Sequence, residues 1–271
     1  MKTEKRIIQI NGMQAALRLY LWENLKTVSP SLKRPLLVIC PGGGYNHVSE
    51  REAEPVALKF MSMGFHTCVL EYNVAPAVFP QALLELGQSI KEIREHANEW
   101  DVDKNKIIIC GFSAGGHLAG SLGMFWNEDW LSKQLKTTAK MIQPNGLILS
   151  YPVVTSGEFA HQGSFEMLTG GTLAPELMDK LSLEKQVTKN TPPVFLWHTY
   201  EDQTVPVENS LLLAMALKRC HIPLEMHLFP YGPHGISLGN QETARFDHPD
   251  DIQPRCQEWT EMAKSWILGL R

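Results

Sequence analysis

Residues 107–120, Ile-Ile-Ile-Cys-Gly-Phe-Ser-Ala-Gly-Gly-His-Leu-Ala-Gly, constrain the fold more than any other stretch of the chain. Residues 107–110 form a continuous apolar run, as expected for a strand that is buried on both faces. From Ala114 to Phe125 the apolar side chains recur close to helical spacing. The sequence therefore predicts a strand, a sharp turn and a helix in immediate succession.

The turn between them reads Gly111-Phe112-Ser113-Ala114-Gly115, a Gly-x-Ser-x-Gly pattern. A strand that ends and a helix that begins around one residue force Ser113 into a strained backbone. Only glycine lets the neighbouring backbones pass so closely, which explains Gly111 and Gly115. The Ser113 hydroxyl would stand at the mouth of the sheet, above a helix N-terminus that favours developing negative charge. We predict a nucleophile here rather than an ordinary surface serine.

Apolar segments with strand character alternate with segments of helical spacing along the rest of the chain. We expect buried strands at residues 36–40, 65–72, 146–151, 194–198 and 224–229, and helices at residues 81–100, 207–220 and 257–270. This alternation is typical of the α/β class and predicts a mostly parallel, doubly wound sheet.

Two local patterns mark a turn and a helix start. Asn11-Gly12 lies between the alternating segments 6–10 and 15–22, and Asn-Gly suits the positive φ angles of a tight hairpin. We expect this N-terminal antiparallel pair to open the sheet. The run Ser49-Glu50-Arg51-Glu52 has the pattern of a capping box and predicts the start of a helix that Gly64 ends. Pro55 fits best in the first turn of a helix, and a start a few residues later is the alternative.

The length of the chain, 271 residues, suits one large α/β domain, and we expect residues 1–271 to form a single domain. The segment 155–193 is the one long stretch without a clear strand, and it contains several glycines and paired prolines. Because it lies between two predicted strands, we expect a partly helical, lid-like insertion that overhangs the site.

Composition narrows the function classes. The net charge is −4 and the basic residues are scattered, which argues against a nucleic-acid partner or a membrane surface. The start, MKTEKRIIQI, is unlike a signal peptide, and no apolar run approaches the roughly 18 residues of a membrane span. The five cysteines include no C-x-x-C pair, which favours buried free thiols over disulfides or a zinc site. We expect a cytoplasmic protein that uses no metal.

A nucleophilic serine needs a general base, and the base needs a carboxylate that orients it. Asp202 follows the predicted strand 194–198, and His234 follows the strand 224–229. Both residues lie in loops at the carboxyl ends of strands, where open α/β sheets bind their ligands. The chain order Ser113, Asp202, His234 also matches one known class of serine hydrolase. We predict that these three residues are catalytic.

Other residues compete for the two supporting roles. Glu201 is the main alternative carboxylate, although the shorter aspartate beside a Val-Pro turn fits better. Of the ten histidines, His198 and His227 lie within predicted strands, where packed or hydrogen-bonded core residues are the commoner case. His117, one turn into the helix after the serine, is expected to bond locally. His47 lies near the triple-glycine loop and is a candidate pocket residue.

Attack on an ester creates an oxyanion that needs preorganised N–H donors. The amide of Ala114, next to the nucleophile, is one expected donor. The loop 41–45, Pro-Gly-Gly-Gly-Tyr, follows the predicted strand 36–40 and offers backbone without bulky side chains. We predict Gly43 and Gly44 as the further donors of this oxyanion hole. A phosphate-binding loop is the alternative, but no Gly-Lys-Ser/Thr follows.

Together these segments resemble the α/β-hydrolase superfamily, and more closely its bacterial acetyl-esterase and acetylxylan-esterase-like branch, often labelled sugar hydrolase, lipase/esterase or feruloyl-esterase-like. The match begins at about residue 34 and rests on Pro-Gly-Gly-Gly-Tyr (41–45), Ser-Glu-Arg-Glu (49–52), Tyr-Asn-Val-Ala-Pro (72–76), the serine turn (111–117) and Gly-Pro-His-Gly (232–235). Hormone-sensitive-lipase-like esterases carry His-Gly-Gly-Gly at the glycine loop. Pro41 replaces that histidine here, which favours the acetyl-esterase branch.

The resemblance implies an α/β-hydrolase fold and the hydrolysis of small, short-chain carboxylic esters, including acetyl groups on sugars. It implies an acyl-enzyme on Ser113, served by His234 and Asp202, without metal or cofactor. Two alternatives stay open: amide cleavage, as by formamidase-like or small peptidase-like relatives, and a non-catalytic binding protein of the same fold. Non-catalytic members typically lack one of the three catalytic residues, and this chain has all three.

Tyr45 and His47 follow the glycine loop and are candidate substrate-binding residues, together with the segment 155–193. Simple packing is an equal alternative for each of them. The expected partner is a small-molecule ester. Because esterases with this fold often dimerise, the resemblance is also compatible with a homodimer.

Overall fold

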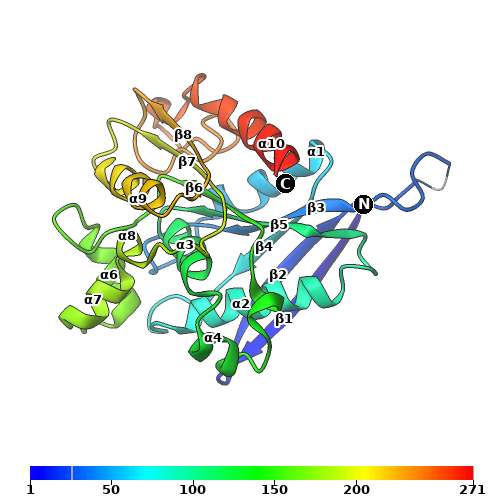
Figure 1. Ribbon diagram of the computed structural model, residues 1–271. Coiled ribbons are helices and arrows are strands. Elements are labelled where there is room, and N and C mark those ends of the chain that lie inside the picture. The colour runs from blue at the N-terminus through cyan, green and yellow to red at the C-terminus, as the bar shows by residue number, and fades with distance from the viewer. Residues whose placement is uncertain (26, 271) are drawn as a thin grey trace.

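The computed structural model describes residues 1–25 and 27–270. Within these residues one eight-stranded sheet forms the centre, with the strand order β1-β2-β4-β3-β5-β6-β7-β8 (Figure 1). The strands are β1 (Lys2–Ile10), β2 (Met13–Leu21), β3 (Arg34–Cys40), β4 (His66–Glu71), β5 (Val102–Phe112), β6 (Gly146–Ser150), β7 (Val194–Thr199) and β8 (Leu224–Phe229).

Most of the sheet is parallel. β1 and β2 form the predicted antiparallel hairpin, with Asn11 (φ 52°) and Gly12 (φ 78°) in its turn. β2 also pairs antiparallel with β4, and every pair from β4 across to β8 is parallel. The predicted fold class, a mostly parallel sheet with an N-terminal antiparallel hairpin, is confirmed.

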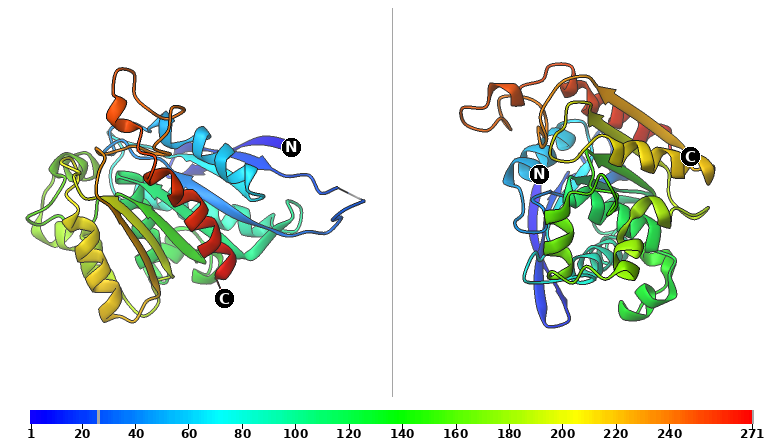
Figure 2. Two further views of the ribbon diagram at one scale, coloured as in Figure 1. Left: turned by 90° about the horizontal axis from the view of Figure 1, so that it is seen from above. Right: turned by 90° about the vertical axis from the view of Figure 1, so that its left-hand side faces the viewer.

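Helices cover both faces of the sheet (Figure 2). The main ones are α1 (Glu54–Ser62), α2 (Gln81–Glu95), α3 (Ala114–Phe125), α9 (Glu208–Arg219) and α10 (Trp259–Gly269). α1 and α10 pack on one face, where Phe60 and Trp259 lie against Phe112 and other sheet residues. α2, α3 and α9 bury their apolar side chains on the other face. The central strands are therefore buried on both sides, which is why they read as continuous apolar runs.

The capping box predicted at residues 49–52 is wrong. Glu50–Glu52 form a short 3₁₀ turn, η1, and the Ser49 side chain makes no capping bond. α1 begins only at Glu54, with Pro55 in its first turn. The Glu52 side chain points into the protein, where its carboxylate accepts a hydrogen bond from the Gly42 amide. A carboxylate that is engaged elsewhere is not available to cap a helix.

Other differences follow from tertiary contacts. α2 stops at Glu95 rather than at residue 100, because the chain turns back into β5 and the Val102 amide donates to the Ala97 carbonyl. Between α3 and β6 the structure forms two short helices that the sequence did not predict, α4 (Asp129–Gln134) and α5 (Ala139–Ile142). Each is too short to show a clear apolar period.

The segment 155–193 contains three helices, α6 (Gln162–Thr169), α7 (Pro175–Leu181) and α8 (Leu183–Gln186). Phe165, Leu168, Leu181 and Leu183 are buried in the core that covers the α3 side of the sheet. The segment is thus packed against the body of the molecule through its own apolar side chains, as a partly helical insertion.

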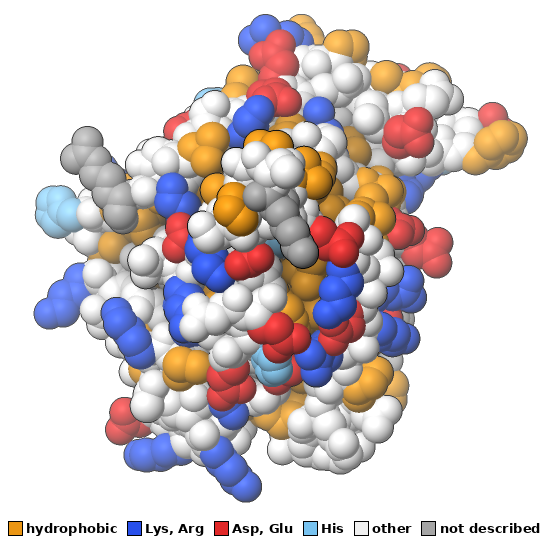
Figure 3. Space-filling view, turned by 90° about the vertical axis from the view of Figure 1, so that its right-hand side faces the viewer, with side chains coloured by type: hydrophobic (Ala, Val, Ile, Leu, Met, Phe, Trp, Pro, Cys, Tyr) orange, Lys and Arg blue, Asp and Glu red, His pale blue; other side chains and the backbone are white. Residues whose placement is uncertain are grey.

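All five cysteines are free, and burial raises the pKa of Cys40, Cys68, Cys110 and Cys256. Among residues 1–25 and 27–270, no helix has the length and apolar character that crossing a bilayer requires. The same residues contain no cluster of three or more histidines, cysteines or carboxylates that would hold a metal ion. On the face drawn in Figure 3, basic and acidic side chains are interspersed.

Candidate active site

Ser113 occupies the turn between β5 and α3. Its backbone has φ 53° and ψ −119°, a left-handed conformation that is strained for a residue with a side chain. A Cβ atom on Gly115 would collide with the carbonyl oxygens of Cys40 and Pro41, and one on Gly111 would collide with the Gly115 carbonyl. Both glycines therefore allow the backbone approach that forms this turn, as the sequence predicted.

The three predicted catalytic residues lie in one hydrogen-bonded chain. His234 Nε2 is 2.8 Å from Ser113 Oγ, and His234 Nδ1 is 2.6 Å from Asp202 Oδ2. The residues come from the carboxyl ends of β5, β7 and β8, which the parallel sheet brings to one edge. Residues 121 positions apart, Ser113 and His234, thus meet at hydrogen-bonding distance.

Asp202 is held by four hydrogen bonds. Its Oδ1 accepts from the amides of Thr204 and Val205, both at 2.9 Å. Its Oδ2 lies near Nδ1 of His234 at 2.6 Å and near Nε2 of His198 at 3.1 Å. Burial alone would raise the pKa of this carboxyl, but the hydrogen bonds from His198 and His234 outweigh burial and hold its pKa below the ordinary range. Asp202 is therefore an anion at neutral pH.

The negative charge of Asp202 sets the tautomer of His234. A carboxylate only accepts hydrogen bonds, so Nδ1 of His234 must carry the proton that it shares with Asp202. In the neutral imidazole Nε2 is then left with a lone pair directed at the Ser113 hydroxyl. This arrangement allows proton transfer from serine to histidine. Glu201, the alternative carboxylate, is exposed on the surface and makes no side-chain contact with His234 among the described residues.

His198 is a fully buried histidine beside the site. Its Nδ1 is 2.7 Å from Ser210 Oγ, and its Nε2 is 3.0 Å from the Val205 carbonyl as well as near Asp202. Because the Val205 carbonyl accepts only, Nε2 must be the protonated nitrogen. The sequence predicted a packed or hydrogen-bonded core histidine here, which is confirmed, but its bond to Asp202 depends on the tertiary structure.

Three backbone amides near Ser113 have no hydrogen-bond partner among the described residues, those of Gly43, Gly44 and Ala114. The preceding amide, that of Gly42, differs because it donates to Glu52 Oε2 at 2.8 Å. Gly43 and Gly44 both adopt positive φ, 121° and 64°, and a Cβ on Gly43 would collide with the His47 carbonyl. This geometry requires glycine, and it leaves the three amides free to bind an anion.

A cavity of about 600 Å³ opens at Ser113. His234, Gly43, Gly44 and Ser113 share its wall with residues of η1 and of the segment 155–193. The other lining residues are Asn46, His47, Ser49, Arg51, Glu52, His161, Gly163, Met167, Thr204, Gly235 and Arg245. The volume suits a small-molecule ligand.

Of the two predicted substrate-binding residues, His47 lines this cavity and Tyr45 does not. The Tyr45 side chain is buried in the core, where its hydroxyl lies 2.8 Å from His117 Nδ1 and its ring packs edge-on against Tyr72. We therefore correct the prediction for Tyr45, whose contacts are those of a packing residue. His117 does not bond locally as expected, because its Nε2 lies 2.8 Å from the Leu181 carbonyl in α7.

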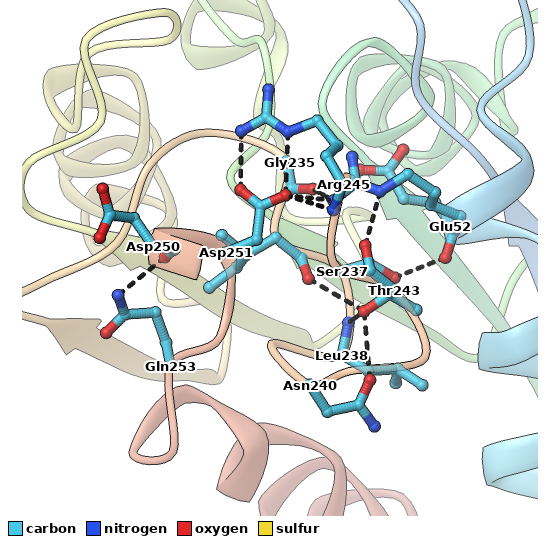
Figure 4. Close-up of polar contacts among 12 residues, drawn as sticks. Glu52, Gly235, Ser237, Leu238, Asn240, Thr243, Arg245, Asp250, Asp251 and Gln253 are labelled. Carbon is cyan, nitrogen blue, oxygen red and sulfur yellow. Dashed lines mark hydrogen bonds and ion pairs between the residues drawn. The ribbon is translucent and has the colours of Figure 1, made fainter. Parts of the chain in front are cut away.

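The sequence did not identify several polar residues of the cavity wall. Arg51 and Arg245 both bind Asp251, which is fully buried, and Glu52 also lines the cavity. Figure 4 draws the contacts between Arg245 and Asp251. His161, from the segment 155–193, has a pKa lowered by burial and then by the nearby His234. The only local signal for Arg51 and Glu52 was the run 49–52, which the capping-box pattern also explained.

Comparisons with known proteins agree with this architecture. The BD-FAE family model matches residues 25–217. The chain is 38% identical over 215 residues to endo-1,4-beta-xylanase B of Butyrivibrio fibrisolvens, a match that covers 78% of this chain and 34% of that protein. It is 26% identical over 229 residues to an acetylxylan esterase of Xylanibacter ruminicola, covering 82% and 44% of the two chains. The chain therefore spans less than half the length of these two relatives.

Solved structures match over nearly the whole chain. A carboxylesterase from Lactobacillus plantarum superposes with a TM-score of 0.89 at 28% identity, covering 99% of this chain and 97% of the other. An acetyl ester-xyloside bifunctional hydrolase from Caldicellulosiruptor lactoaceticus superposes with a TM-score of 0.80 at 37% identity, covering 95% and 89%.

Proposed function

This chain belongs to the BD-FAE family, in an esterase branch of the α/β-hydrolases, and from that premise we propose that it is a serine carboxylesterase for short-chain esters. The observation that carries the proposal is the hydrogen-bonded chain from Ser113 through His234 to Asp202, which opens on a cavity. Such a chain activates a serine that is otherwise a weak nucleophile.

In the proposed reaction, His234 Nε2 takes the Ser113 proton as Oγ attacks the ester carbonyl carbon. The carbonyl oxygen becomes an anion, which the amides of Ala114, Gly43 and Gly44 stabilise. Asp202 stabilises the imidazolium that forms at His234. When the tetrahedral intermediate collapses, the imidazolium gives its proton to the departing alcohol, and an acyl-Ser113 ester remains. Water then hydrolyses this ester by the same proton transfers.

The preferred acyl group that we propose is acetyl, and acetylated sugars are the proposed substrate class. Two relatives support this choice, since one is named an acetylxylan esterase and another an acetyl ester-xyloside hydrolase. The cavity wall around Ser113 offers polar groups for a sugar, among them Asn46, His161 and Thr204.

The test compares wild type with Ser113→Ala on p-nitrophenyl esters from acetate to octanoate. We expect the highest kcat/KM on acetate and a loss of at least about 10³-fold in the variant, because the nucleophile is gone while the fold is kept. Unchanged activity in Ser113→Ala would refute the mechanism. If wild type cleaves no ester, N-formyl amides are the next substrates, and inactivity on both classes would favour a non-catalytic binding protein.

A further inference from the structure

Glu52 is a buried carboxylate in the wall of the active-site cavity, and the proposed reaction does not use it. Its residue is only 3% exposed. Oε2 accepts a hydrogen bond from the Gly42 amide at 2.8 Å, and Oε1 lies 2.7 Å from the Tyr151 hydroxyl. A buried carboxylate is costly unless its oxygens are satisfied, and here each oxygen has a partner.

The hydrogen of the Tyr151 hydroxyl is directed at Glu52. The same hydroxyl oxygen accepts a hydrogen bond from the Ser237 amide at 2.9 Å, so its proton remains for the carboxylate. The Tyr151 ring lies edge-on to the His234 ring, with 5.1 Å between centroids. Glu52 therefore connects, through one tyrosine, to the loop that carries His234.

The neighbouring residue Arg51 holds η1 to the same loop by independent contacts. Its guanidinium donates to the carbonyls of Gly235, at 2.9 Å, and Thr243, at 2.6 Å. Its own carbonyl accepts from Ser237 Oγ at 2.8 Å. η1 is thus anchored to the His234 loop by Arg51 as well. The contacts that Glu52 itself adds are the bonds from the Gly42 amide and from the Tyr151 hydroxyl.

That bond distinguishes Gly42 from the two glycines that follow. The Gly42 amide donates to Glu52, whereas the amides of Gly43 and Gly44 have no partner among the described residues. The site around Gly42 is also crowded, since a Cβ there would lie 2.8 Å from Glu52 Oε2 and 2.9 Å from Ser113 Cβ. The direction of the Gly42 amide therefore influences where the next two amides point.

We propose that Glu52 is a positioning residue that links the two halves of the catalytic apparatus. Its carboxylate holds the loop of Gly42, Gly43 and Gly44 and, through Tyr151, the loop of His234, in one fixed relation. The role rests on the proposed esterase function, in which Gly43 and Gly44 bind the oxyanion. The hydrogen-bond partners of the Glu52 carboxylate are the Gly42 amide and the Tyr151 hydroxyl, so its proposed effect on the reaction is exerted through these groups.

The test is Glu52→Gln, with Glu50→Gln as the matched control. A glutamine keeps the size of the side chain but has one accepting oxygen, so it cannot accept from both Gly42 and Tyr151. Glu50 lies in the same 3₁₀ turn and is exposed. We expect kcat on p-nitrophenyl acetate to fall about 10- to 100-fold in Glu52→Gln. This is at most about the fall in kcat that removal of one oxyanion donor causes. KM should stay within about twofold of the wild-type value.

Two measurements separate positioning from simple loss of folded protein. Titration with a p-nitrophenyl phosphonate counts active sites, so kcat is expressed per competent Ser113. The inhibition constant of phenylboronic acid, which forms a tetrahedral adduct on serine, should rise by about the same factor as kcat falls. A variant whose titratable fraction drops while kcat per site and the boronic acid constant stay at wild-type values would overturn the proposal.

Hydrogen exchange tests the linkage without any activity. We expect faster amide exchange in the peptides that cover residues 42–44 and 235–237 in Glu52→Gln, and wild-type exchange in Glu50→Gln. Tyr151→Phe keeps the bond from Gly42 to Glu52, so it should affect the 235–237 peptide more. If wild type hydrolyses no ester, the proposed function fails, but the exchange rates still test whether Glu52 links the Gly42–Gly44 loop to the His234 loop. Unchanged exchange at residues 42–44 in Glu52→Gln would refute it.

Discussion

At the scale of single residues, the electrostatics of the site centre on Asp202. Two amides hold Oδ1, and two histidines approach Oδ2, so this carboxylate has little freedom to rotate. His198 shares its single Nε2 proton between Asp202 and the Val205 carbonyl. By donating to the same oxygen that faces His234, it withdraws negative charge from the contact that would stabilise the imidazolium.

Replacement of His198 should therefore weaken this network. His198→Leu removes one hydrogen bond to Asp202 and leaves the buried Ser210 hydroxyl and Val205 carbonyl without this partner. We expect the free energy of unfolding to fall by about 2 to 4 kcal/mol. His198→Gln keeps an N–H near the position of Nε2 and should lose less.

The measurement is urea unfolding of both variants and of wild type at pH 7.5. Equal stability of His198→Leu and wild type would contradict this account of His198.

At the scale of elements, the junction of β5 and α3 depends on backbone contact rather than on side-chain packing. Gly115 lies at the start of α3, directly against the backbone of Cys40 and Pro41 at the end of β3. The obstacles to a side chain there are the carbonyl oxygens of Cys40 and Pro41, which cannot rotate away as a side chain would. The same approach brings the glycine loop next to the helix N-terminus.

Gly115→Ala should consequently destabilise the protein by about 3 kcal/mol or more, the size of a large core substitution. The matched control is Gly269→Ala at the end of α10, where nothing lies within 4 Å of an added Cβ. There alanine should be neutral or stabilise the helix by up to about 1 kcal/mol. Urea unfolding measures both effects, and equal stability of the two variants would contradict the proposed role of close backbone approach.

The elements themselves were largely predictable, because short-range patterns determine them. Strand-like apolar segments predicted the parallel strands, although β8 (Leu224–Phe229) contains Glu225 and His227 and is mostly half-buried. Asn11-Gly12 predicted the hairpin. The errors occurred where a distant partner decides the local structure. The sequence of Ser49–Glu52 fits a capping box, but in the structure the Glu52 carboxylate accepts hydrogen bonds from the Gly42 amide and the Tyr151 hydroxyl instead. Tyr45 resembles a pocket residue until His117 binds its hydroxyl.

At the scale of the whole molecule, the sheet and its helices bury two neutral histidines far from Asp202 along the chain. His117 connects Tyr45 to the Leu181 carbonyl in α7, and His66 accepts from the Trp22 amide at 3.0 Å. Burial lowers the pKa of each to about 4 from the ordinary 6.5. Between about pH 6.5 and 4, these two histidines are therefore mostly neutral in the folded protein and mostly protonated in the unfolded chain.

Stability should therefore fall on mild acidification. Between pH 6.5 and 4 the unfolded chain binds more protons than the folded one, so stability is full above pH 6.5 and decreases toward pH 4. Each histidine contributes up to about 3 kcal/mol to this decrease. Asp202, whose pKa lies below its usual range, adds a further loss only as the pH falls below about 4.

Urea unfolding at pH 7.5 and at pH 4.5 measures this decrease. In His117→Gln, which does not titrate, the difference in free energy of unfolding between the two pH values should be smaller than that of wild type by about 2 to 3 kcal/mol. An equal difference in the variant and in wild type would show that His117 is not protonated on unfolding in this range.

The linear pattern of residues was enough to predict the features that depend on near neighbours in the chain or on chain order. These are the alternation of strands and helices, the sterically required glycines at 111 and 115, and the candidates Ser113, Asp202 and His234 with their chain order. Strand periodicity and the steric limits of turns involve only a few consecutive residues, so they can be predicted from the sequence.

Contacts between groups that are distant in the chain depend on the three-dimensional packing. The strand order places the ends of β5, β7 and β8 at one edge, and this sets the distances among Ser113, Asp202 and His234. The partners of Glu52 and His198 likewise come from other elements. A hydrogen bond depends on position within a few tenths of an ångström, and that position results from the packing of the entire core rather than from any local segment.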